Sequence, residues 1–119
     1  MLQIDYESRA PIYEQLVDKI KNLIVKNVLK PNEQMPTVRD LASNLTINPN
    51  TVQRAYRILE ENGYIYSVTG KGSFVSEKLD LIKEDQIKDE IGKLKVVIGR
   101  LENLGVHIEY KIKEGVDEK

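Results

Sequence analysis

Three polar residues suited to nucleic-acid recognition, Asn50, Arg54 and Arg57, recur at spacings of four and three along one segment of this 119-residue chain. At about 100° per residue, a helix would carry all three on one face. A guanidinium donates paired hydrogen bonds to guanine edges and phosphates, and a carboxamide pairs similarly with adenine. Thr51 and Gln53 flank this face, within reach of sugar or phosphate oxygens. The pattern favours contact with double-stranded DNA, although a solvated charge is the alternative for any one exposed arginine.

Further candidates for DNA contact lie before and after this segment. Arg39 would sit in the first turn of a helix capped by Thr37, where free amide groups attract a phosphate. Asn48 is expected to cap the next helix, a role that still permits a phosphate contact. Lys71 and Gly72 fall at the tip of a predicted hairpin, where they would meet the DNA backbone or the minor groove. The alternative for Lys71 is an ordinary solubilising turn.

Three predicted helices would position these residues. Apolar residues at helical spacing indicate one helix over residues 11–27 and a short one over residues 38–45. A third helix is predicted over residues 49–62, with Asn48 as its N-cap and Gly63 as the left-handed residue after its end. Because the second and third helices are separated by only about three residues, they predict a helix-turn-helix.

The residues after the third helix change from helical to strand-like pattern. Two β-rich runs, residues 64–66 and 73–75, flank a turn over residues 68–72 that contains two glycines. A hairpin directly after the second helix of a helix-turn-helix is a wing. The predicted fold class is therefore mainly α with a small β-hairpin wing, and residues 1–76 form a winged helix-turn-helix DNA-binding domain.

Residues 77–119 have a different character, with 9 basic and 11 acidic residues separated by aliphatic ones. Five aliphatic residues are spaced alternately four and three residues apart, as at the a and d positions of two heptads. We call them the dimerisation stripe: Ile87, Ile91, Leu94, Ile98 and Leu101. Gly92 and Gly99 each weaken the isolated helix by about 1 kcal/mol, so it needs a partner surface. A second copy of the chain is favoured as this partner, and packing on the chain's own winged domain is the alternative. Residues 106–116 fit either a strand or a helix.

Composition excludes several function classes. Lys and Arg total 18 against 19 Asp and Glu, so a DNA-binding surface must arise from local arrangement and not from net charge. The chain has no cysteine and one histidine, His107, which excludes thiolate metal sites, disulfides and a multi-histidine site within one chain. No catalytic constellation is visible, so we expect neither an enzyme nor a cofactor nor a metal site. No segment resembles a signal peptide or a membrane span, and a cytoplasmic protein is expected.

Six blocks of this sequence resemble, in order and spacing, the winged helix-turn-helix of the GntR family. They are PIYEQL at 11–16, LKPN at 29–32, MPTVRDLA at 35–42, NPNTVQRAY at 48–56, LEENG at 59–63 and GKGSFV at 70–75. The short C-terminal part is similar to that of the YtrA subfamily, whose members carry a small helical dimerisation region. This chain departs from the usual family sequence at Asn32, Met35 and Thr46. Thr46 replaces a frequent glycine in the helix-turn-helix turn.

The resemblance implies a bacterial transcriptional regulator, usually a repressor, that binds a two-fold symmetric operator as a homodimer. It also implies that Arg39, Asn50, Arg54 and the wing tip at Lys71 and Gly72 occupy DNA-contact positions. A small-molecule effector is a further partner that the sequence leaves open. The alternative function is a winged-helix module that binds protein and not DNA.

Overall fold

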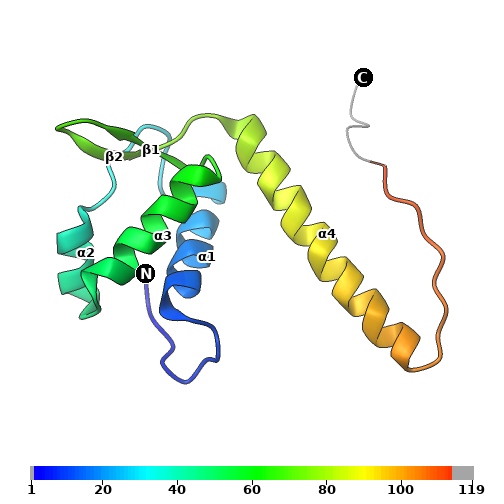
Figure 1. The fold of residues 1–119 in the computed structure, drawn as a ribbon. Coiled ribbons are helices and arrows are strands. Elements are labelled where there is room, and N and C mark those ends of the chain that lie inside the picture. The colour runs from blue at the N-terminus through cyan, green and yellow to red at the C-terminus, as the bar shows by residue number, and fades with distance from the viewer. Residues whose placement is uncertain (1, 114–119) are drawn as a thin grey trace. The chain divides into compact units, whose positions relative to one another are not determined.

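The computed structural model describes residues 2–113. The chain consists of two compact units, Met1–Asp85 and Gln86–Lys119. The elements in chain order are α1 (Ile12–Val25), α2 (Val38–Leu45), α3 (Pro49–Glu61), β1 (Ile65–Val68), β2 (Gly72–Val75) and α4 (Leu79–Asn103) (Figure 1). This order confirms the mainly helical fold with a hairpin wing. No helix among the described residues is long and apolar enough to span a membrane.

The helix-turn-helix starts where the sequence predicts its caps. Thr37 Oγ1 accepts a hydrogen bond of 3.0 Å from the Asp40 amide at the start of α2. Asn48 Oδ1 accepts one of 2.8 Å from the Asn50 amide at the start of α3. Each cap satisfies an amide that has no partner within its own helix. The first residue of each helix is therefore set by a capping side chain only two or three residues away from the amide that it satisfies.

Thr46 ends α2 in the left-handed region, with φ 57° and ψ 50°. This conformation is a genuine outlier for a β-branched residue and costs about 1–2 kcal/mol. The turn still closes, because the Ile47 amide donates to the Ala42 carbonyl over 3.0 Å. The tight turn between α2 and α3 is thus retained without the glycine, at a cost that the surrounding packing offsets. Asn32 also adopts a left-handed backbone, with φ 67°.

The wing contains more pairing than the sequence indicates. β1 and β2 are antiparallel, and Ile65 lies opposite Val75. The link before α2 runs beside β2 and bonds to it. The Asn32 amide donates to the Val75 carbonyl over 2.7 Å, and the Met35 amide donates to the Ser73 carbonyl over 2.8 Å. This pairing attaches the wing to the segment that leads into α2.

One apolar core holds the first unit together. α3 packs against both α1 and α2 (Figure 1). The largest fully buried side chains are Leu16, Ile20, Val52, Leu59, Tyr64 and Val75. Ile82, at the end of the first turn of α4, belongs to the same core and is 6% exposed. The start of α4 is therefore part of the winged unit, whereas the sequence pattern placed the change of character near residue 76.

A nearly buried ion pair fastens this start of α4. Lys21 Nζ lies 2.9 Å from Asp85 Oδ2, and the two side chains are 10% and 17% exposed. The Tyr64 hydroxyl donates to the same carboxylate oxygen over 2.8 Å, and the Lys21 ammonium lies 5.2 Å from the centroid of the Tyr64 ring. The carboxylate is thus satisfied by a cation and a hydroxyl, as burial of a charge requires.

We expect Asp85→Asn to lower the free energy of unfolding by about 3 kcal/mol, because the Lys21 ammonium loses the carboxylate that compensates its burial. Urea unfolding of the full chain measures this. Glu90→Gln is the matched control, because its ion pair with Lys93 is exposed and contributes little. A double replacement, Lys21→Met with Asp85→Leu, should cost less than Asp85→Asn alone. Equal effects of Asp85→Asn and Glu90→Gln would contradict this role.

The second unit contains the rest of α4, and Gly92 and Gly99 lie within the helix. Exposure along the dimerisation stripe is uneven. Ile98 is buried, Leu94 is 46% exposed, and the remaining three are half-buried, namely Ile87, Ile91 and Leu101. After α4, residues 106–113 form neither helix nor strand. The rest of the ambiguous segment 106–116 lies outside the described residues.

Candidate nucleic-acid interface

α3 presents a polar face opposite the side that it buries. Its buried residues are Val52, Ala55, Tyr56 and Leu59. Asn50, Gln53, Arg54 and Arg57 are exposed, and Thr51 is half-buried. The arrangement follows from helical periodicity, because the residues that pack against α1 and α2 define which side remains free. The predicted base-reading residues therefore share one exposed face, as their spacing requires.

The arginines of this surface are not neutralised by acids. Among the residues that the structure describes, no carboxylate forms an ion pair with Arg39, Arg54 or Arg57. Arg39 is exposed in the first turn of α2. Arg54 has its Cζ 3.7 Å from the centroid of the Tyr13 ring, a cation–π contact with α1. All three guanidinium groups thus keep N–H donors for an anionic partner.

A groove of about 350 Å³ brings together predicted residues from separate elements. Thr37, Gln53, Arg57 and Gly72 line it, and they come from the α2 cap, from α3 and from the wing. Tyr56 and Pro36 also line it, and the Tyr56 hydroxyl donates to the Pro36 carbonyl over 2.7 Å. Burial raises the pKa of the Tyr56 hydroxyl above its ordinary range.

The wing tip is braced by a residue that sequence reasoning missed. Gln34 Nε2 donates to the Lys71 carbonyl over 2.8 Å. Gly72 has φ +112°, and a Cβ there would come within 3.2 Å of Gln34 Nε2. Glycine is favoured here mainly by this positive φ, which strains any residue with a Cβ. The Lys71 side chain is exposed. No sequence signal identified Gln34, because its partner is 37 residues away.

The two capping residues keep part of their hydrogen-bonding capacity. Thr37 uses an oxygen lone pair as a cap, so its hydroxyl proton is free to be donated. Asn48 uses its carbonyl oxygen, so its amide group keeps two donors. Both side chains are exposed. Capping and phosphate contact are therefore chemically compatible at both positions.

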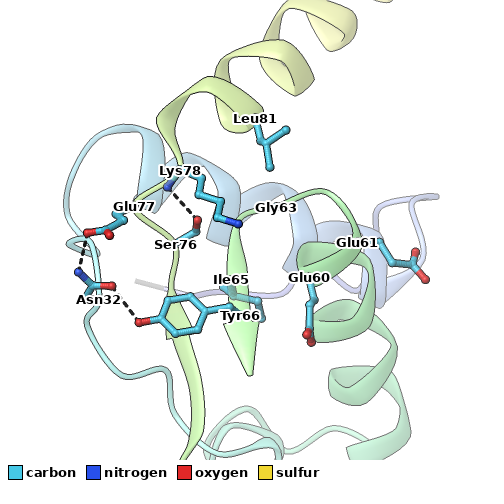
Figure 2. Close-up of a pocket in the computed structure, with 10 residues that line it drawn as sticks. All are labelled: Asn32, Glu60, Glu61, Gly63, Ile65, Tyr66, Ser76, Glu77, Lys78 and Leu81. Atoms are coloured by element: carbon cyan, nitrogen blue, oxygen red, sulfur yellow. Dashed lines mark hydrogen bonds between the residues drawn. The ribbon is translucent and has the colours of Figure 1, made fainter. Parts of the chain in front are cut away.

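A second hollow of about 550 Å³ lies beside the end of α3 and the start of α4 (Figure 2). Figure 2 shows Asn32 between two partners at its edge. The Tyr66 hydroxyl donates to Asn32 Oδ1 over 2.8 Å, and Asn32 Nδ2 donates to Glu77 Oε1 over 2.9 Å. Nothing in the sequence indicated a pocket here. No group of three His, Cys, Asp or Glu residues suited to a metal occurs in the described part of the chain.

Residues 12–75 match the profile of the family described as bacterial regulatory proteins, gntR family. The HTH-type transcriptional repressor YtrA of Bacillus subtilis (strain 168) is 42% identical over 98 residues, which are 79% of this chain and 75% of that protein. The crystal structure of a transcriptional antiterminator from Listeria monocytogenes EGD-e is similar with a TM-score of 0.76 and 42% identity, over 91% of this chain and 81% of that one.

A DNA complex is also among the similar structures. AraR(DBD) in complex with operator ORX1 has a TM-score of 0.57 and 26% identity, over 63% of this chain and 96% of that chain. The similarity covers the share of the sequence expected for the winged unit.

Proposed function

This chain belongs to the gntR family of bacterial regulatory proteins, and from that premise we propose that it represses transcription by binding a two-fold symmetric operator as a homodimer. It is a DNA-binding regulator and not an enzyme, as its family and relatives indicate. The observation that carries the proposal is the exposed surface on which Arg39, Arg54, Arg57 and Lys71 face solvent without ion pairs to described carboxylates.

The proposed contacts divide between positioning and base reading. α3 enters the major groove, where Asn50, Arg54 and Arg57 reach base edges or adjacent phosphates. Thr51 and Gln53 flank them and reach sugar or phosphate oxygens. Phosphate contacts at the start of α2 and at the cap of α3 set the register, through the donors of Thr37, Arg39 and Asn48. The wing tip, Lys71 and Gly72, approaches the backbone or the minor groove.

The proposed dimer rests on α4. The stripe from Ile87 to Leu101 follows heptad spacing, and a coiled-coil-like contact would give it the partner that the two helical glycines demand. Exposure of Leu94, Val96 and Val97 supports a partner for this helix. A two-fold dimer places two copies of α3 on half-sites about one or more helical turns apart. Residues 1–76 and 77–119 are thus proposed as the DNA-binding and dimerisation regions.

An effector and a cellular location complete the proposal. We place the protein in the cytoplasm, because its proposed operator is chromosomal DNA. The hollow in Figure 2 offers the Tyr66 hydroxyl and the Glu77 carboxylate to a small polar molecule, and it is where we propose that an effector be sought. Its lining includes residues of both α3 and α4, so an occupant would touch the proposed reading helix and the start of the proposed dimer helix.

Selection of bound fragments from the source genome tests the proposed function. We expect enrichment of a palindrome whose half-sites are spaced by about one or more turns of DNA. A gel shift with the enriched duplex and with a scrambled duplex of equal length then measures specificity. The rival function, a protein-binding winged helix, predicts that no sequence is enriched and that both duplexes bind equally weakly.

Lys71→Ala should weaken binding to the enriched and scrambled duplexes alike, because a phosphate contact does not depend on base sequence. Titration at several salt concentrations should show a slope of log affinity against log salt that is smaller by about one for each lost contact. Lys113→Ala, an exposed charge outside the winged unit, is the control. A loss confined to one base position would assign Lys71 to base reading instead.

A further inference from the structure

We infer that Tyr13 is a positioning residue that holds the Arg54 guanidinium ready for base reading before DNA arrives. The inference rests on the proposed function and adds a specificity-determining residue that lies on α1, outside the helix-turn-helix and the wing. The observation behind it is the contact between Arg54 Cζ and the centroid of the Tyr13 ring, at 3.7 Å. That distance is van der Waals contact, so the cation lies directly over the ring.

The contact leaves the recognition chemistry of Arg54 available. A ring beneath a guanidinium occupies one face of the planar group, and the N–H donors lie in its plane. Arg54 remains exposed, and no described carboxylate competes for its donors. Stacking therefore restricts the position of the Arg54 guanidinium and leaves its N–H donors available to hydrogen-bond guanine.

Tyr13 is itself held in place, which a platform requires. It lies in the first turn of α1, two residues before Gln15, whose side chain ties this end of the helix to the N-terminal arm. Gln15 Oε1 accepts from the Asp5 amide over 2.9 Å, and Gln15 Nε2 donates to the Asp5 and Ala10 carbonyls, each over 3.0 Å. Gln15 is 9% exposed. Its three bonds fix the backbone on which the Tyr13 ring stands.

The other arginines of the surface lack such a platform. Among the described residues, no aromatic ring contacts the guanidinium of Arg39 or Arg57. An unrestrained arginine loses rotamer freedom when it binds, a cost that reduces affinity by about 2- to 12-fold for each such side chain. Tyr13 removes part of that cost for Arg54 alone. Its effect should therefore appear in specific binding and depend on the presence of Arg54.

The test measures binding of the full chain to the enriched duplex and to a scrambled duplex of equal length. We expect Tyr13→Leu to weaken binding to the enriched duplex by about three- to tenfold and to leave the scrambled duplex unchanged. Tyr13→Phe, which keeps the ring, should stay within about twofold of the original. In an Arg54→Ala background Tyr13→Leu should have no further effect, whereas in an Arg57→Ala background it should keep its full effect.

A second measurement is independent of DNA. The Arg54 side-chain protons of the free protein should be shifted upfield by the ring in the original chain and in Tyr13→Phe, and should lose this shift in Tyr13→Leu. Equal losses from Tyr13→Leu with and without Arg54 would overturn the inference, as would unchanged binding of Tyr13→Leu. If Arg54→Ala weakens the enriched duplex and Tyr13→Leu does not, only this inference fails. If Arg54→Ala itself binds normally, the proposed role of Arg54 fails and the inference with it.

Discussion

Arg54→Ala is expected to reduce operator binding to the level of nonspecific DNA while leaving the fold and the oligomeric state unchanged. A bidentate arginine–guanine contact contributes about 1–3 kcal/mol of discrimination, and a two-fold operator contains the contact twice. Removal of the side chain costs little stability, because Arg54 is exposed and its one ring contact contributes about 0.5–1 kcal/mol. A gel shift against the enriched and scrambled duplexes measures the loss of discrimination.

Arg100→Ala provides the matched control for this variant, because it removes an exposed arginine from α4 and not from the winged unit. It should change the affinity for both duplexes by less than about twofold. Sedimentation of Arg54→Ala at the same mass as the original chain would show that assembly is intact. If Arg54→Ala discriminates between the enriched and the scrambled duplex as well as the original chain does, the base-reading role proposed for α3 is wrong.

A chain shortened to residues 1–86 is expected to be a folded monomer whose operator affinity is lower by about 10²- to 10⁴-fold. The shortened chain keeps the whole first unit, including Ile82 and the Asp85 partner of Lys21. It lacks the dimerisation stripe of α4, so two winged units are no longer held together in one dimer. The expected loss of affinity equals the gain that two linked binding modules have over a single module, because binding of the first module raises the effective concentration of the second.

Two measurements separate this explanation from damage to the DNA-binding surface. A duplex that contains a single half-site should bind the 1–86 chain and the full chain with similar affinity. Leu94→Glu in the full chain should reproduce the loss of the dimer without any truncation, because Leu94 is exposed on the stripe. A 1–86 chain that sediments as a stable dimer would rule out the proposed role of α4.

The position of the cut is itself informative. A chain ending at residue 76, where the sequence changes character, lacks Ile82 and leaves the Lys21 ammonium without the Asp85 carboxylate. It should be less stable than the 1–86 chain by about 3 kcal/mol or more. The boundary suggested by composition therefore differs from the one at which a stable fragment can be made.

Short-range patterns were sufficient to predict the architecture. The capping side chains of Thr37 and Asn48, the helical spacing of apolar residues and the glycines of the wing act within a few residues of each other, so they can be read along the chain. The same periodicity predicted that Asn50, Arg54 and Arg57 would be exposed together, as they are. The roles of these residues on DNA, and of the stripe in a dimer, stay predictions.

Contacts between distant parts of the chain could not be predicted in this way. Gln34 braces Lys71, Lys21 pairs with Asp85, and Tyr13 lies under Arg54, across separations of 37, 64 and 41 residues along the chain. No periodic signal links such residues, because they meet only when helices and strands pack around the common core. Local chemistry thus specified which elements form and which faces remain free. Packing of those elements decided how the arginines are held, how the wing is fixed and where the first unit ends.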